Sequence, residues 1–175
     1  MRLKKALSLI LYYGLAKHFP NYSYPLGRWF NALRIAVIRN IIPVGQNCRI
    51  MKNVYFGNGN NVSIGHSCRI NEKTRLDRVT IGNHVMIARE TVFLGKMHEF
   101  EDLETPMVDQ GERSQGQTVV EDNVWIGLRA IILPGLTLRN GTIIGAGAVV
   151  TKDTEVNGIY AGVPAKLVRF RQPPV

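Results

Sequence analysis

The chain has 175 residues, of which 45% are hydrophobic and 20% are charged, and its formal net charge is +9. This length allows one domain with a sizeable core plus an appendage, and the composition is typical of a soluble globular protein. The charge is uneven, because residues 1–71 contain ten Lys or Arg and no Asp or Glu. That excess predicts an acidic partner surface. The sequence has no zinc-finger spacing, RNA-binding motif or run of basic residues, so we expect contact with an anionic membrane surface and not with nucleic acid.

Residues 1–43 are expected to form a basic amphipathic helical segment. Two apolar stripes recur at helical spacing, one before and one after the break at Pro20 and Pro25. The stripes consist of Leu3, Leu7, Ile10, Leu11 and Leu15, and then of Leu26, Trp29, Phe30, Leu33, Val37 and Ile41. Two interpretations stay open: the stripes dock on the rest of the protein, or they contact a membrane.

The N-terminus resembles a secretory signal in its basic start and its apolar run over residues 6–16. Lys17 follows that run directly, without a cleavage site of small residues, and the run is too short to span a bilayer. We therefore expect the segment to be retained in a cytoplasmic protein, peripheral to the inner face of the membrane.

From Val44 onward the apolar pattern repeats every six residues. The register is occupied at Val44, Ile50, Phe56, Ile64, Ile70, Leu76, Ile81, Ile87, Phe93, Val120, Ile126, Ile132, Leu138, Ile144 and Val150. A six-residue period without helix-length intervals is typical of a parallel β-helix. We expect these side chains, and the small or apolar residues four positions after them, to fill a prism formed by residues 44–165. Glycines directly after the register position, such as Gly65 and Gly127, suit tight corners where a Cβ would clash.

Two further features depend on this register. Cys48 and Cys68 occupy equivalent inward positions of successive coils, so we expect buried, reduced thiols there. They provide no disulfide framework and no metal-binding pattern. The repeat is interrupted once, between Phe93 and Val120, by an acidic segment that contains His98. Long excursions from a rigid repeat often carry function, so we expect this one to be functional.

Several motifs in this register resemble those of the left-handed β-helix (hexapeptide-repeat) acyltransferases. They are Met97–His98, Val124–Gly127, Ile144–Gly147, Val150–Asp153 and Ala161–Lys166. The sequence looks most similar to the galactoside and maltose O-acetyltransferase branch and to acetyltransferases of capsule and exopolysaccharide synthesis, over roughly residues 44–170. The resemblance implies an all-β, left-handed parallel β-helix with an N-terminal α-helical segment and one long loop. It also implies a homotrimer that binds acetyl-coenzyme A between subunits and needs no metal.

The resemblance also assigns roles to individual residues. His98, in an active-site loop over residues 94–118, matches the general base. The coenzyme contacts fall on Trp125, Leu128, Ala146, Thr151, Lys152, Lys166 and Arg169, the last two in a C-terminal tail of residues 166–175. Leu128 stands where the family has a small residue, beside the thioester. On the acceptor side, Asn71 and Asp77 lie near the family's sugar-binding positions.

These features predict an acetyl-coenzyme A-dependent O-acetyltransferase that modifies a sugar hydroxyl of a surface polysaccharide or its precursor. A hydroxyl is a poor nucleophile, and histidine is a suitable base to activate it near neutral pH. Two alternatives remain: an N-acetyltransferase of an amino-sugar nucleotide or another amine, and a noncatalytic β-helix scaffold.

Overall fold

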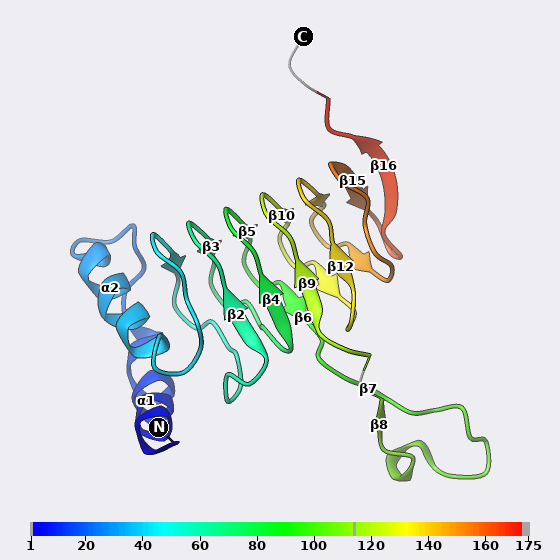
Figure 1. Ribbon diagram of the computed structural model, residues 1–175, viewed down its shortest axis with the longest axis horizontal. Coiled ribbons are helices and arrows are strands. Elements are labelled where there is room, and N and C mark those ends of the chain that lie inside the picture. The colour runs from blue at the N-terminus through cyan, green and yellow to red at the C-terminus, as the bar shows by residue number, and fades with distance from the viewer. Residues whose placement is uncertain (1, 114, 173–175) are drawn as a thin grey trace.

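The computed structural model describes residues 2–113 and 115–172. Two helices lie at one end of an elongated stack of short strands, and one excursion leaves the stack part-way along it (Figure 1). Parts of three predicted segments fall outside the described residues. These parts are residue 1 of the segment 1–43, residue 114 of the loop 94–118 and residues 173–175 of the tail 166–175.

The strands of the stack form three sheets, one for each side of a prism. The seven-stranded sheet contains β1 (Arg49–Ile50), β3 (Arg69–Ile70), β5 (Met86–Ile87), β10 (Trp125–Ile126), β13 (Ile143–Ile144), β15 (Gly158–Ala161) and β16 (Lys166–Phe170). The four-stranded sheet contains β2 (Val62–Ile64), β4 (Val79–Ile81), β9 (Thr118–Val120) and β12 (Thr137–Leu138). The three-stranded sheet contains β6 (Val92–Phe93), β11 (Ile131–Ile132) and β14 (Val149–Val150).

Successive coils pair in parallel and in register, as the six-residue period requires. Ile126, for example, lies beside Ile87 on one side and Ile144 on the other. All three side chains are buried, and so are the fourth-position residues Val124 and Ala130. Side chains alternate between inward and outward along each side, and the inward ones at the register and fourth positions fill the prism. The predicted parallel β-helix is confirmed.

Two glycines explain how closely the corners of neighbouring coils stack. A Cβ added at Gly65 would lie 2.4 Å from the carbonyl oxygen of Gly82, and one at Gly127 would lie 2.6 Å from the amide nitrogen of Ala146. Real Cβ atoms do not approach backbone so closely, so these corners require glycine for lack of space. The predicted role of both glycines is confirmed.

The two cysteines are free and buried on successive coils, as the register predicts. The Cys48 thiol lies 3.1 Å from the carbonyl oxygen of Gly65, and the Cys68 thiol lies 3.1 Å from that of Gly82. A hydrogen bond with Cys48 and burial both raise the pKa of the Cys68 thiol. Cys68 is therefore an inert core residue.

The N-terminal segment contains α1 (Arg2–Gly14), the 3₁₀ turn η1 (Ala16–His18) and α2 (Gly27–Ile38). The helices dock through polar and aromatic side chains and through the buried Ile35 and Ile38 of α2. The Tyr12 hydroxyl donates to the Val54 carbonyl at 2.7 Å, and Asn31 exchanges hydrogen bonds with the backbone at Cys48 and Ile50. Burial raises the pKa of Tyr12, which keeps this donor neutral.

The docking interpretation is therefore wrong for most of the two predicted stripes. Leu3, Leu7, Ile10, Leu11, Leu15, Leu26, Trp29 and Leu33 are all exposed. The physical reason is that the prism end offers carbonyl oxygens, which the opposite helix faces satisfy with hydroxyl, amide and guanidinium groups. The apolar stripes are left outside.

The excursion and the C-terminal strand complete the fold. Within residues 94–118, β7 (Met97–His98) pairs antiparallel with β8 (Glu112–Arg113), and the 3₁₀ turn η2 (Met107–Asp109) lies between them. Residues 166–170 of the expected tail form β16, which pairs antiparallel with β15 and closes the far end of the seven-stranded sheet. This strand brings the basic residues after the last coil onto a sheet.

Candidate active site

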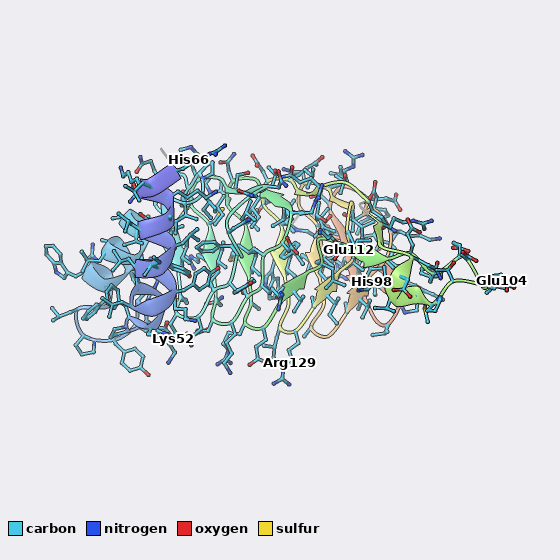
Figure 2. The ribbon with its side chains drawn as sticks, turned by 90° about the horizontal axis from the view of Figure 1, so that it is seen from below. Lys52, His66, His98, Glu104, Glu112 and Arg129 are labelled. Atoms are coloured by element: carbon cyan, nitrogen blue, oxygen red, sulfur yellow. The ribbon has the colours of Figure 1, made fainter. Side chains whose placement is uncertain are left out.

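His98 lies on the β7–β8 hairpin of the excursion. It stands opposite Glu112 in the ladder, and Figure 2 shows the two residues side by side, well away from the tip of the excursion at Glu104. Lys96 forms an ion pair with Glu112 and lowers the pKa of this carboxyl. His98 also lowers it, by a smaller amount. The hairpin thus presents an exposed imidazole next to a carboxylate that stays ionised. Such an arrangement can orient an imidazole for proton transfer.

Asp77 lies at the base of the same excursion. A Cβ added at Gly95 would be 2.4 Å from the Asp77 carboxyl carbon, so the chain leaves the prism directly against this side chain. The excursion connects β6 of the three-stranded sheet with β9 of the four-stranded sheet. Asp77 and His98 therefore belong to the edge between these two sheets.

Trp125, Leu128 and Ala146 belong to a different edge. Trp125 faces outward on β10, between Met86 and Ile143 on the neighbouring strands, and is about half exposed. Leu128 and Ala146 lie on adjacent coils at the corners that lead from the seven-stranded to the three-stranded sheet. The Leu128 carbonyl accepts the amide N–H of Gly147 at 2.7 Å, so backbone from both coils is laid flat along this edge.

Asn71 lies on this second edge as well. It lines a cavity of about 360 Å³ together with Glu72, Ala88, Arg89 and Leu128. Its amide donates to the carbonyl oxygen of Ile87 at 2.9 Å, which fixes the side chain. Asn71 and Asp77, both predicted on the acceptor side, are therefore not brought together within one chain.

The structure adds two residues that sequence reasoning missed. Arg89 lines the Asn71 cavity from a corner of the coil. The six-residue pattern predicts only the inward positions, so it does not identify this residue. Glu112 is 14 positions from His98, and only the antiparallel ladder of the hairpin makes them neighbours. A sequence pattern for this pair would have required recognition of the hairpin itself.

Four exposed residues lie at the C-terminal end of the stack. Thr151 and Lys152 directly follow β14, while Lys166 and Arg169 lie on β16, opposite Ala161 and Ile159. The amide of Ala165 donates to the Val149 carbonyl at 2.8 Å, which brings Lys166 close to the end of β14. Three basic side chains can thus meet anionic groups of a ligand along these last coils.

The two edges border the same three-stranded face of the prism. His98 and Asp77 lie along one edge of that face, and Trp125, Leu128, Ala146 and Asn71 lie along or beside the other. A site that uses both groups is therefore incomplete within one chain.

The other described histidines and possible metal ligands do not form a second centre. His66 and His84 are exposed at corners, and the His66 Nδ1 accepts the amide N–H of Gln46 at 3.1 Å. Among residues 2–113 and 115–172, no group of three His, Cys, Asp or Glu side chains could hold a metal ion.

Known proteins share this repeat. Residues 117–152 match the family model described as the hexapeptide repeat of succinyl-transferase. The galactoside O-acetyltransferase of Escherichia coli (strain K12) is 36% identical over 129 residues, which are 72% of this chain and 62% of that protein. The chain belongs to the hexapeptide-repeat acyltransferase family. The resemblance noted from the motifs is thereby confirmed.

Two further members of the family extend the comparison. A putative lipopolysaccharide biosynthesis O-acetyltransferase of the same E. coli strain is 31% identical over 101 residues, which are 54% of this chain and 51% of that protein. The chain thus spans less than two thirds of either curated relative. A hexapeptide-repeat acetyltransferase from Vibrio cholerae, solved with acetyl-coenzyme A, has 23% identity and a TM-score of 0.80. The match covers 98% of this chain and 89% of that one, so the shared fold extends into the N-terminal helices.

Proposed function

We propose that the protein is an acetyl-coenzyme A-dependent O-acetyltransferase that modifies a sugar hydroxyl of a surface polysaccharide or its precursor. The observation that carries this proposal is the position of His98, on a hairpin opposite Glu112, in a chain of the hexapeptide-repeat family. The relatives named for galactoside and lipopolysaccharide O-acetylation support a sugar acceptor.

In the proposed reaction, His98 accepts the proton of the acceptor hydroxyl. The oxygen attacks the thioester carbonyl carbon and forms the new C–O bond, and the C–S bond then breaks. The imidazolium returns its proton to the departing thiolate, so the products are an acetyl ester and free coenzyme A. Asp77, at the base of the same excursion, and Asn71 of a neighbouring copy are proposed to hold the sugar.

The coenzyme is proposed to lie along the second edge. Trp125 would pack against pantetheine, and the flat backbone at Leu128 and Ala146 would run beside it. Leu128 would also narrow the space next to the thioester. At the end of the stack, Thr151, Lys152, Lys166 and Arg169 would contact the phosphates, where charge-assisted hydrogen bonds are strongest.

We infer a homotrimer, because the two half-sites lie on different edges and a closed ring of three copies repeats the same contact. Outward-facing Ile131, Val92 and Val149 make the face between the half-sites apolar, which suits an interface. We further infer that the coil is left-handed, as in the family. The free thiols of Cys48 and Cys68 support a cytoplasmic location.

The alternative acceptor is an amine, and one observation favours it. The excursion beyond His98 carries the exposed acids Glu101, Asp102 and Glu104, which would attract a cationic group. Treatment of the product with hydroxylamine separates the two reactions, because it cleaves an acetyl ester and leaves an amide intact. A noncatalytic scaffold, in contrast, would release no coenzyme A with any acceptor.

The test is replacement of His98 with Ala. The side chain is exposed, so the fold and acetyl-coenzyme A affinity should remain. Acetyl transfer should fall roughly 10²–10⁴-fold, the usual contribution of a positioned general base.

His66→Ala is the matched control, since this exposed histidine lies at a corner far from the hairpin along the stack. It should keep full activity. Light scattering should give three times the mass of one chain for both variants. Full activity of His98→Ala on an accepted sugar would show that His98 is not the base.

A further inference from the structure

The two N-terminal helices turn their leucines outward. Leu3 is 74% exposed, Ile10 is 71% exposed and Trp29 is 72% exposed, whereas Tyr12 and Arg34 on the inner faces are fully buried. In an ordinary surface helix the apolar stripe faces the core and the polar face meets water. Here most of the apolar stripe of each helix faces outward, although α2 also buries Ile35 and Ile38 against the prism. We call the exposed set the outer helical face; it consists of Leu3, Leu7, Ile10, Leu11, Leu15, Leu26, Trp29 and Leu33.

The outer helical face is continuous across both helices. Leu11 of α1 and Leu33 of α2 line one apolar groove of about 320 Å³, with Phe19 and Val37 also in its wall. A neighbouring cavity of about 580 Å³ continues the same side of α2 and is lined by residues that include Tyr22, Tyr24, Leu26, Arg28 and Trp29. An exposed apolar patch of this extent indicates an interaction surface.

The charge around the outer helical face identifies the partner. The exposed side chains of Arg2 and Lys4 flank the leucines of α1, and that of Arg28 flanks Trp29 on α2. Acidic residues are absent from residues 1–71, and the first is Glu72. Two copies of such a face would repel each other, whereas a bilayer that contains anionic lipids would attract it. Trp and Tyr beside the leucines are the side chains that favour the boundary between headgroups and acyl chains.

The location of the face fits contact with a planar surface. The helices lie at the end of the stack opposite β15 and β16, and the excursion projects from the middle (Figure 1). Contact through the helices therefore leaves His98 and the basic C-terminal strand uncovered. In the part of the chain that the structure describes, no helix has the length and apolar character needed to cross a bilayer. Contact would accordingly be interfacial.

We propose that the outer helical face binds the surface of an anionic lipid bilayer. The leucines and Trp29 enter the interface, while Arg2, Lys4 and Arg28 contact lipid phosphates. Such binding combines burial of apolar area with electrostatic attraction, so it requires both the leucines and the basic residues.

The experiment is sedimentation of the full-length protein with vesicles. One set contains phosphatidylcholine alone, and the other contains equal parts of phosphatidylcholine and phosphatidylglycerol. The unchanged protein should sediment with the mixed vesicles and much less with phosphatidylcholine alone, and added salt should release it. The double variant Leu7→Gln, Ile10→Gln should bind at least about tenfold more weakly, because it removes apolar area from the interface. Lys4→Gln with Arg28→Gln should lower binding to the mixed vesicles by about tenfold or more.

Val156→Gln is the matched control, because Val156 is also an exposed apolar residue but lies near the far end of the stack. It should bind like the unchanged protein. All variants should keep the circular dichroism spectrum, the molar mass and the acetyl transfer rate with a water-soluble acceptor. Absence of binding by the unchanged protein would overturn the proposal, as would equal binding by all variants. A drop in molar mass for Leu7→Gln, Ile10→Gln would show instead that a second copy covers the face.

Discussion

Replacement of Arg34 with Met tests how the helices are fixed to the prism. Arg34 is fully buried on α2, and its guanidinium donates only to backbone carbonyls. Nε reaches Ala16 at 3.1 Å, Nη1 reaches Ile50 at 2.8 Å, and Nη2 contacts Phe19 and Pro20. One side chain thus connects α2 with the turn after α1 and with the first coil. Burial lowers the pKa of Arg34, but a guanidinium stays charged throughout the accessible pH range.

The expected cost follows from the carbonyls that would lose their donor. Phe19 and Pro20 lie in a partly exposed connection and can turn to water, whereas Ala16 and Ile50 are buried. Two unsatisfied buried carbonyls cost about 2–6 kcal/mol. Met avoids the desolvation of a buried charge, which offsets part of that loss. We expect a net destabilisation of about 2–4 kcal/mol. The cost of leaving two buried carbonyls without donors should exceed the desolvation free energy that is regained when the buried charge is removed.

Unfolding in urea measures this difference. Trp29 lies on α2 and Trp125 on the prism, so a Trp125→Phe background makes fluorescence report on the helices alone. Hydrogen exchange should show earlier opening of residues 2–42 in Arg34→Met. Arg28→Met is the control, because Arg28 is exposed on the same helix and should change stability by no more than about 0.5 kcal/mol. If Arg34→Met and the Trp125→Phe background unfold at the same urea concentration, hydrogen bonds from Arg34 to the backbone carbonyls are not what fixes the helices to the prism.

Two other predictions concern the candidate site. Lys152→Ala should raise the KM for acetyl-coenzyme A by about tenfold with little change in kcat, because a phosphate contact contributes equally to ground and transition states; a steady-state assay that finds only a kcat defect would contradict the placement of the coenzyme. Lys96→Met should raise the pKa of the Glu112 carboxyl toward its ordinary value, since the ammonium that lowers it is removed. An NMR titration that finds no upward movement would show that the ion pair is not formed in solution.

The six-residue register made the prism predictable from sequence. In a β-helix, the position of a residue within its six-residue repeat decides whether its side chain faces inward. The identity of the neighbouring coil does not matter. Ile126 and Ile132 could therefore be assigned to the core without knowledge of their neighbours, and both are buried. The same regularity located Cys48 and Cys68, and it located His98 as a departure from the pattern.

The candidate site was predictable only residue by residue. The family resemblance predicts roles for His98, Trp125 and Asn71, but it contains no information about which edge of the prism each residue occupies. The three sheets separate His98 from the other two, and only the hairpin ladder makes Glu112 its neighbour. These relations depend on the order in which strands from distant coils pair, which the local pattern does not encode.

The sequence by itself determined that residues 1–43 form amphipathic helices, but the tertiary structure decided which side faces the prism. Helical periodicity indicates an apolar stripe and leaves its partner open. The end of a β-helix exposes carbonyl oxygens, and burying them against leucine would leave strong acceptors without donors. Tyr12, Asn31 and Arg34 supply those donors beside the buried Ile35 and Ile38, so the faces that carry these residues dock and most of the leucine stripe remains outside.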